Sequence, residues 1–576
     1  MTAILGKVAF NILYGDRKKK IAQFLRTTTP ESVLSDLHAC LVREGVSSIT
    51  PQAVFDASSI RDSPQGQPYW TKKSFQNHLA RTHPDTTFPD IAIDVLWSCF
   101  CFYAYHPFPL PDAGDKKLDL SAFERGLILL ALQGTKLLGL VDDGFGHCWW
   151  RNEEPCNCKL RLNRIFRSIS LVVDRQSTSD SPVAGFDPSI TDDVIDAILP
   201  TFPAHPKLHP SLEQLKPLAE RLREERRTDQ LPIKANDLAA LLCLLLRLRV
   251  HKSTWSRDFH YGSFEESSSE KEELANILAR SFCLGQDEDL APESVLRALD
   301  FLPNLEQLFH QLWSTLFQPG TPTEIPNVET DSSPDTMMDG ILRAVSLFIP
   351  SFQTHKRTEL ARKVQLITFH KFYDSISQSL TDSLDLDHIF QPIVHKDSDQ
   401  DQSHLVLFLG NQAPDLKEVV VGAFFPSGTL TPAVAKEAKK LATINTARRI
   451  PLPQLLFQLK PSFSLFRLNK ESSSYSSSQA DDSATEHSID HLTCIGEPNR
   501  SKVGLELDPV TRQATFLRGT ATAANRMPGA YEEVARKHGD GADTVDGDQQ
   551  ERRTAFTVTR VAIFNVEGGP KYDNPW

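Results

Sequence analysis

The stretch Leu455–Leu468, LLFQLKPSFSLFRL, decides how the second half of this chain folds. It is a dense apolar run with one proline near its middle and an arginine, Arg467, between Phe466 and Leu468. Burying apolar surface is worth about 25 cal/mol per Å², so we expect other elements to cover this run on most sides. The side chains expected in the interior are Phe457, Leu459, Phe463 and Leu465.

Short β-branched and aromatic runs on both sides of this stretch predict a sheet. Leu405–Leu409 (LVLFL) and Val419–Phe425 have the composition of strands that are buried on both faces. Val503–Leu507 (VGLEL) alternates apolar and polar positions, and Phe556–Phe564 (FTVTRVAIF) is a further strand. The pattern predicts an α+β domain over 386–568, built from antiparallel sheets with one or two helices.

Two polar insertions interrupt this predicted domain, and one helix lies among its strands. The helix is expected at Pro432–Leu441. The insertion at about 471–490 is serine-rich, and the one at about 520–554 is polar and rich in glycine. Neither buries enough apolar surface to offset the entropy of ordering it, so both are predicted to be disordered spacers or regulatory loops.

Residues 1–385 show mainly helical periodicity, so an all-α region is expected to precede the sheet domain. The helix expected at Asn236–Val250 is apolar nearly all round, which indicates a buried helix. Pro217 is expected to kink or restart a neighbouring helix. The other predicted helices are Glu31–Gly45, Asp192–Leu199, Ser211–Arg227, Glu270–Phe282, Glu293–Leu302, Leu305–Phe317 and Met338–Phe348.

Composition excludes several classes of protein. A chain of 576 residues is long enough for two or more domains, and its net charge of −12 argues against a general nucleic-acid binder. The most apolar short run, Val95–Tyr105, is too short to span a membrane. Nine cysteines without a secretory signal suggest a reducing compartment with free thiols. The N-terminal segment favours a first amphipathic helix over a mitochondrial presequence, so a cytoplasmic location is expected.

One cluster of residues has the chemistry of a metal or redox site. His147, Cys148, Cys156 and Cys158 are ligand types that zinc prefers, but their spacing is unlike that of known zinc sites. A redox-sensitive thiol pair at Cys156 and Cys158 is a second interpretation. A loop anchored by tryptophan, with ordinary thiols, is the third and the favoured one. We therefore predict no bound metal and no cofactor.

Two acidic segments have part of a calcium-loop pattern. Asp397–Asp401 matches its first positions, but Gln402 and Phe408 stand where the loop needs glycine and glutamate. The run from Asp540 to Glu551 fails at its middle positions. Nucleophile-elbow, metalloprotease, phosphate-loop and dinucleotide motifs are absent from the sequence, which favours a non-enzyme.

The C-terminal part resembles a TLDc domain, because six short segments occur in the order of that family. They are Leu405–Gly410, Gly422-Ala423-Phe424, Leu456–Pro461 with Phe463–Arg467, Cys494-Ile495-Gly496, Val503–Asp508 with Ala514-Thr515-Phe516, and Phe556–Glu567. The chain departs from the family at Ile367–Tyr373, which matches its early W-x-L-x-Y segment poorly. It also has Ala562 where the family commonly has glutamate. On this resemblance, the residues that form the domain's structural motif are Gly422, Phe424, Phe457, Leu459, Phe463, Leu465, Gly496 and Phe516.

The arrangement of a helical half before this domain resembles the fungal proteins called restriction of telomere capping protein 5-like. This resemblance also implies a degenerate EF-hand-like part, with Leu118–Phe123 as the start of one helix. TLDc proteins are linked to oxidative-stress resistance and to binding the vacuolar-type proton ATPase, with no known catalytic residues. The resemblance thus implies a non-catalytic adaptor that reaches the vacuole through a protein partner.

Arg467 and the loop residues Pro426, Ser427 and Gly428 are the expected contact residues of such an adaptor. An internal ion pair is an equally favoured role for Arg467. The alternative function is a redox-sensing or hydrolytic enzyme that uses the Cys148, Cys156 and Cys158 cluster or a triad assembled only in space.

Overall fold

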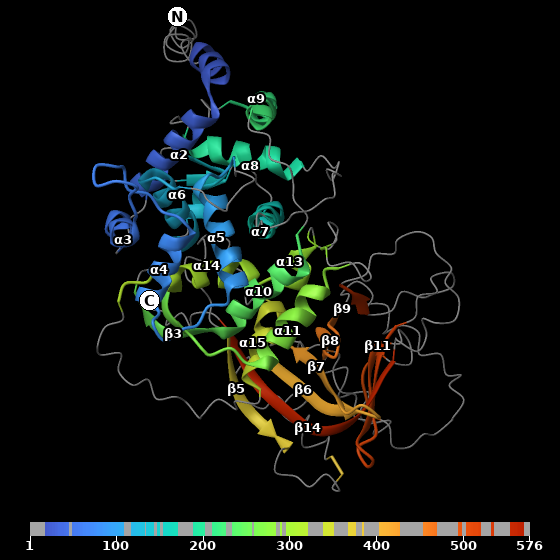
Figure 1. Cartoon of the computed structure of the whole chain (residues 1–576). Helices are drawn as coiled ribbons and strands as arrows, with labels where there is room; N and C mark the ends of the chain where they lie inside the picture. The colour runs from blue at the N-terminus through green and yellow to red at the C-terminus, as the bar shows by residue number, and fades with distance from the viewer. Residues whose placement is uncertain are drawn as a thin grey trace, which may run out of the picture. The chain divides into compact units, whose positions relative to one another are not determined.

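The computed structural model describes most of the helical and strand segments of the chain. The described residues are 18–44, 49–108, 117–132, 134–142, 147–149, 154–170, 188–201, 210–225, 233–255, 259–283, 289–290, 295, 297–320, 338–350, 367–375, 383–384, 403–426, 453–468, 493–497, 503–519, 531–534 and 553–568. The fold is mixed, as predicted: helices dominate the first half and a large antiparallel sheet follows (Figure 1).

The chain forms two compact units. The helical unit comprises Met1–Leu299, Leu305–Pro334 and Thr358–Val364, and the sheet unit comprises Asp300–Asn304, Asp335–Arg357 and Gln365–Trp576. The sheet unit therefore takes in residues ahead of the expected start at 386.

The helical unit begins with helical residues 18–27 and continues through a series of labelled helices. These are α2 (Pro30–Glu44), α3 (Pro51–Ser58), α4 (Lys72–Thr82), α5 (Asp90–Ala104), α6 (Leu120–Ala131), α7 (Glu154–Ile169), α8 (Pro188–Ile198), α9 (Leu212–Glu225), α10 (Ala235–Arg247), α11 (Ser269–Arg280) and α14 (Leu305–Leu316). Short 3₁₀ turns η1 (Gly134–Leu137) and η2 (Leu199–Thr201) and the hairpins β1 (Leu140–Asp142) with β2 (His147–Trp149) and β3 (Leu248–Thr254) with β4 (His260–Phe264) connect them. The four-residue helix α13 (Ala298–Phe301) is divided between the two units.

Helix α5 lies at the centre of the helical unit and packs against α4, α6, α7 and α10. Its sequence is apolar nearly all round, and every residue of Ala92–Ala104 except Asp94 is buried. Aromatic rings pack around it: Phe100 lies 5.5 Å from Phe123 and 5.9 Å from Trp313, measured between ring centroids. Burying these large side chains supplies much of the unit's stability.

An antiparallel bridge joins the loop between α3 and α4 to the loop between α5 and α6. Trp70 and Leu118 exchange backbone hydrogen bonds of 2.9 and 2.8 Å. Thr71 then caps α4, and Asp119 caps α6 by accepting from the Ala122 amide at 2.7 Å. The expected EF-hand-like segment is therefore the end of this loop and the first turn of α6, where the Asp119 carboxylate stabilises the helix start.

A buried ion-pair network joins α7 to α8. The Arg164 guanidinium donates to Asp193 and to Asp196, each at 2.5 Å, and all three side chains are almost fully buried. Arg167 also pairs with Asp193. Buried charges persist only when they are paired, so the loss of either aspartate would leave an uncompensated cation in the core.

The sheet unit contains one helix and ten strands among its described residues. They are α15 (Asp339–Phe348), β5 (Ile367–Asp374), β6 (Ser403–Gln412), β7 (Lys417–Phe425), β8 (Leu455–Lys460), β9 (Ser464–Leu468), β10 (Thr493–Glu497), β11 (Val503–Leu507), β12 (Gln513–Arg518), β13 (Tyr531–Glu533) and β14 (Arg553–Gly568). The strands pair in the order β10-β11-β12-β14-β6-β7-β8-β9-β13, and β5 pairs with β14. All these pairings are antiparallel, as expected.

The sheet folds over so that distant strands enclose one core. Phe466 on β9 and Phe516 on β12 lie 6.0 Å apart between ring centroids. Both belong to a buried cluster that also includes Val421, Ile495 and Val561 from other strands. The predicted strands at 405–409, 419–425, 503–507 and 556–564 all lie within this sheet, and each is longer than or as long as expected.

Strand β5 is Ile367–Asp374, the segment that matches the TLDc pattern poorly. It pairs with β14, and the Arg560 guanidinium binds the Asp374 carboxylate through two hydrogen bonds, of 3.0 and 2.6 Å. Ala562 is fully buried and lies between Asp374 and Leu407 in the ladder. A carboxylate at this position would be desolvated, which explains why alanine fits it here.

Two structural details correct the sequence-based expectations. The helix predicted at Asn236–Val250 ends at Arg247, and the chain continues into the hairpin β3–β4, so the first half is not purely α-helical. Within the insertion at 520–554, which we predicted to be disordered, Tyr531–Glu533 forms β13 on the edge of β9. Tyr531 explains this order, because its ring is buried and its hydroxyl donates to the Pro453 carbonyl at 2.8 Å.

Several other predictions agree with the structure only in part or fall on residues that it does not describe. Pro217 lies inside α9, which continues through it. The helix predicted at Glu293–Leu302 is described over Ala298–Phe301. The helix at Pro432–Leu441, the insertion at 471–490 and the calcium-like runs at Asp397–Asp401 and 540–551 lie outside the described residues.

Candidate functional site

Gly422 and Phe457 interlock at the centre of the sheet. They are ladder partners on β7 and β8, and Phe457 is fully buried. A Cβ atom placed on Gly422 would lie 2.1 Å from the Phe457 Cζ atom, far inside van der Waals contact. The glycine is therefore needed to make room for the ring.

The other residues of the predicted structural motif occupy the same unit. Leu459, Leu465, Phe424 and Phe516 are buried. Phe463 is half-buried, and its ring centroid lies 5.1 Å from that of Phe348 on α15, which also packs on Phe457 at 4.8 Å. Gly496 has a φ of +89°, and a Cβ there would lie 2.7 Å from Leu456 Cδ1. Glycine is thus favoured here for two reasons: it adopts the positive φ without strain, and it leaves room for Leu456 of β8.

The predicted contact residues are less fully described. Arg467 lies on β9 with about half of its side chain exposed. Its guanidinium lies 3.7 Å from an Asp300 carboxylate oxygen and donates to the Asp300 carbonyl at 3.2 Å. Pro426 follows β7 and is half-buried, whereas Ser427 and Gly428 lie outside the described residues.

The histidine–cysteine cluster spans two elements. His147 and Cys148 lie on β2, where they pair with Asp142 and Val141, and Cys156 and Cys158 lie at the start of α7. The side chains of these four residues lie outside the described part of the structure. Among the side chains that are described, no three histidine, cysteine or acidic residues gather as metal ligands.

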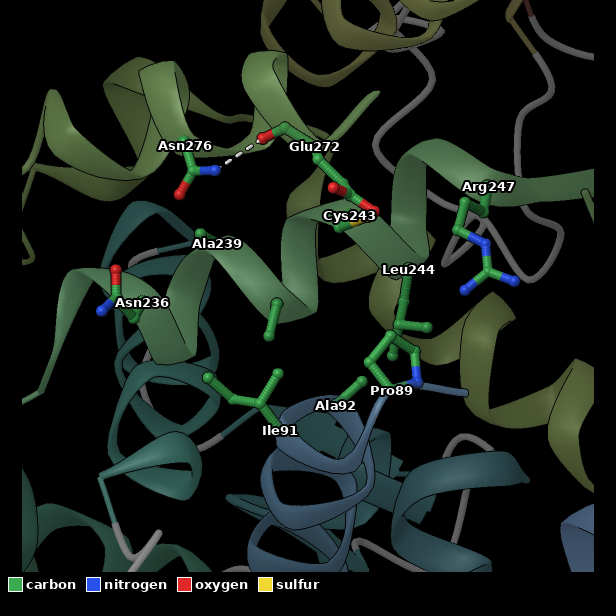
Figure 2. A pocket seen from close by; sticks show the side chains of 11 residues that line it. Pro89, Ile91, Ala92, Asn236, Ala239, Cys243, Leu244, Arg247, Glu272 and Asn276 are labelled. Carbon is green, nitrogen blue, oxygen red and sulfur yellow. Dashed lines mark hydrogen bonds between the residues drawn. The ribbon is translucent and has the colours of Figure 1, made fainter. Parts of the chain in front are cut away.

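A pocket of about 350 Å³ opens between the start of α5, one face of α10 and α11 (Figure 2). We call it the α5–α10–α11 pocket. Its lining residues are Pro89, Ile91, Ala92, Asn236, Ala239, Ala240, Cys243, Leu244, Arg247, Glu272 and Asn276. Figure 2 shows Ile91 and Ala92 on the α5 side, Arg247 at one end and Asn236 at the other. Apolar walls with a few polar groups are typical of small-molecule sites.

Arg247 is the most unusual residue of this pocket, because it is 2% exposed. Its guanidinium donates from Nε to the Glu265 carbonyl at 2.8 Å and from Nη2 to the Thr87 carbonyl at 3.0 Å. Its Nη1 atom is buried without a hydrogen-bond partner among the described residues. Burial lowers the pKa of Arg247 and raises the pKa of the half-buried Cys243 thiol.

Sequence reasoning missed the pocket, although part of its signal was present. Cys243 and Arg247 are four residues apart, so they share one face of α10. An arginine that ends an otherwise apolar, buried helix is expected to be desolvated. The convergence of α5 and α11 on that face depends on tertiary packing, which periodicity does not reveal.

No protein-family model, curated protein or solved structure matches this chain. Within the described part of the chain, no helix has both the length and the apolar character needed to cross a membrane.

Proposed function

We propose that this chain is a non-catalytic adaptor of the TLDc type that docks on the vacuolar-type proton ATPase. The main support is the packing of Gly422 against Phe457. The resemblance assigns these residues to two separate segments, and in the sheet each depends on the size of the other. The segments that carry the resemblance thus contribute to one interdependent core, as segments of one domain would.

Docking through Arg467 is consistent with its surroundings. Its pairing with Asp300 is solvent-exposed and long, and exposed ion pairs contribute little to stability. A partner carboxylate could therefore replace Asp300 at small cost, and arginine is among the residues enriched at interface hot spots. Association with the vacuolar membrane would follow from the protein partner.

Binding of the full chain to purified vacuolar-type ATPase tests this proposal. The full chain is immobilised, and the dissociation constant is measured for wild type, Arg467→Ala and Asp300→Ala. Both variants remove the internal pair, but only the first removes the guanidinium. We expect Arg467→Ala to weaken binding about tenfold or more and Asp300→Ala to leave it unchanged.

The outcomes separate the adaptor role from the contact assignment. Absence of saturable binding by the wild-type chain would refute the adaptor. Equal loss of affinity in both variants would instead show that Arg467 acts by holding Asp300, and the contact assignment would fail.

A further inference from the structure

Helical residues 18–27, which we call the basic helix, place their cations on the side that faces solvent. Ile21 is buried, so the side of the helix around it packs on the helical unit. At about 100° per residue, Lys19 and Arg26 lie close together on the opposite side, and both are exposed. The exposed cations of the basic helix are Lys18, Lys19, Lys20 and Arg26. The helix thus presents an outward face whose only charges are positive.

Arg221 on α9 anchors the C-terminal end of the basic helix. Its guanidinium donates to the Thr28 carbonyl at 2.8 Å and to the Leu25 and Arg26 carbonyls at 3.3 Å each. The last turn of a helix leaves such carbonyls without partners inside the helix, so the arginine caps it. Figure 1 shows the basic helix near the N label, at the edge of the helical unit. The cationic face is therefore held in one position and points away from the core of the unit.

The cations of the basic helix have no acidic partners among the described residues. No acidic residue lies within 18–30, and none of the four cations forms an ion pair in the described part of the chain. Helix α9 carries four acids and three cations, and its Glu225 pairs with Arg221. The two helices together therefore keep a net positive charge, which attracts anions to this part of an otherwise acidic protein.

The residue types and the helical conformation select among anionic partners. Three of the four cations are lysines, which act as point charges, whereas the planar fork of arginine is the better match for a protein carboxylate. Binding modes that add an extended peptide to a sheet edge cannot use a segment that is already helical. A net charge of −12 also opposes binding along a nucleic acid. A layer of lipid phosphates needs only a helix that carries cations on its outward side, which is the arrangement of the basic helix.

We propose that the basic helix binds a membrane surface rich in anionic phospholipids, with Lys19 and Arg26 towards the headgroups. Its apolar side stays packed on the protein, so the contact is electrostatic and reversible rather than an insertion. Each basic residue at such a surface strengthens binding about fivefold, so the four together give a preference of roughly several hundredfold over an uncharged membrane. This contact does not depend on the ATPase docking proposed above, because it involves residues of the helical unit alone.

Co-flotation of the full chain with lipid vesicles tests this proposal. One set of vesicles is pure phosphatidylcholine, and the other is a mixture of phosphatidylcholine and phosphatidylserine. We expect saturable binding to the anionic vesicles, little binding to the neutral ones, and a steep loss as the salt concentration rises, because screening weakens such contacts. Equal binding to both sets of vesicles, or none to the anionic set, would overturn the proposal.

Soluble polyglutamate separates a lipid surface from an acidic protein surface. It is added to the anionic vesicles at a concentration that matches their accessible negative charge. We expect most of the protein to stay on the vesicles. Release of the protein by polyglutamate would assign the cationic face to an acidic protein, and the lipid proposal would fail.

Two charge-matched variants locate the contact. The basic-helix variant combines Lys18→Gln, Lys19→Gln and Lys20→Gln. The control variant combines Lys73→Gln, Lys117→Gln and Lys417→Gln, which are all exposed residues outside the basic helix. We expect the basic-helix variant to bind about a hundredfold more weakly, because three cations are lost, and the control variant to bind as the wild type does. Glutamine and lysine have similar helix propensities, so the basic helix should persist, which circular dichroism checks. Equal loss in the two variants would show that net charge alone drives binding and would refute this location.

Discussion

Gly422→Ala is the change that most directly tests how the sheet unit is packed. The added Cβ would lie 2.1, 2.6 and 2.7 Å from three atoms of the Phe457 ring, whereas ordinary contact begins at 3.4 Å. The ring cannot retreat freely, because it is fully buried and packs edge-on against Phe348 at 4.8 Å. The strands or the ring must therefore shift by about 1 Å, as expected of an overpacked core.

The energetic cost follows from two opposing effects. Overpacking of this kind costs about 1–3 kcal/mol. Replacing a strand glycine by alanine returns roughly 0.5–1 kcal/mol of backbone entropy. We therefore expect Gly422→Ala to destabilise the sheet unit by about 1–2 kcal/mol. Phe457→Leu replaces the opposing ring by a smaller side chain and should relieve the clash. The double variant should therefore lose about 1 kcal/mol less unfolding free energy than the two single variants lose in sum.

Hydrogen–deuterium exchange measured by mass spectrometry is the appropriate assay, because it reports β7 and β8 separately from the helical unit. We expect faster exchange in both strands of Gly422→Ala and partial recovery in the double variant. Gly320→Ala is the control, since a Cβ there meets no atom within 4 Å. Unchanged exchange in Gly422→Ala, or strictly additive effects in the double variant, would refute the interlocking of Gly422 and Phe457.

Further predictions concern the helical unit, whose described buried tryptophans make fluorescence a suitable probe. Asp193→Asn should lower the free energy of unfolding by about 3–5 kcal/mol because it removes one of the two carboxylates that balance the buried arginines, whereas the exposed Asp62→Asn should leave the melting temperature unchanged. Equal melting temperatures for the two variants would contradict a buried network. Burial lowers the pKa of both His78 and His83 to about 4, from an ordinary 6.5. As the pH is lowered, these two histidines bind protons in the unfolded state before they do so in the folded state. Their contribution to the free energy of unfolding is therefore fully present above pH 6.5. It is lost as the pH falls towards 4, by up to roughly 3 kcal/mol per histidine. Chemical unfolding followed between pH 7 and 5 should show this loss, and His78→Gln should reduce its slope; a flat profile would contradict neutral burial of these rings.

The strands of the sheet were predictable because their residues carry their own signal. Val419–Phe425 has no polar side chain, and Leu455–Leu459 has only Gln458, as a strand buried on both faces requires. The burial of Phe457, Leu459 and Leu465 followed from the same composition. Gly422 was identified only through the family resemblance, because its packing partner, Phe457, lies on the neighbouring strand and is distant in the sequence.

Other features depend on residues brought together from distant parts of the chain. Strand β13 has three residues in a polar stretch, and the buried side chains of Tyr531 and Val534 hold it against β9. The α7–α8 ion pairs involve charged residues that, in the sequence, look like ordinary solvated positions. The α5–α10–α11 pocket needs three separate helices to converge, so no local pattern predicted it.

Cryo-electron microscopy of vacuolar-type ATPase particles saturated with the full chain would test the central claim most directly. The adaptor proposal predicts density for the sheet unit on the ATPase, with Arg467 facing an acidic side chain of the complex. ATPase particles that lack this density at saturating concentrations of the chain would contradict it.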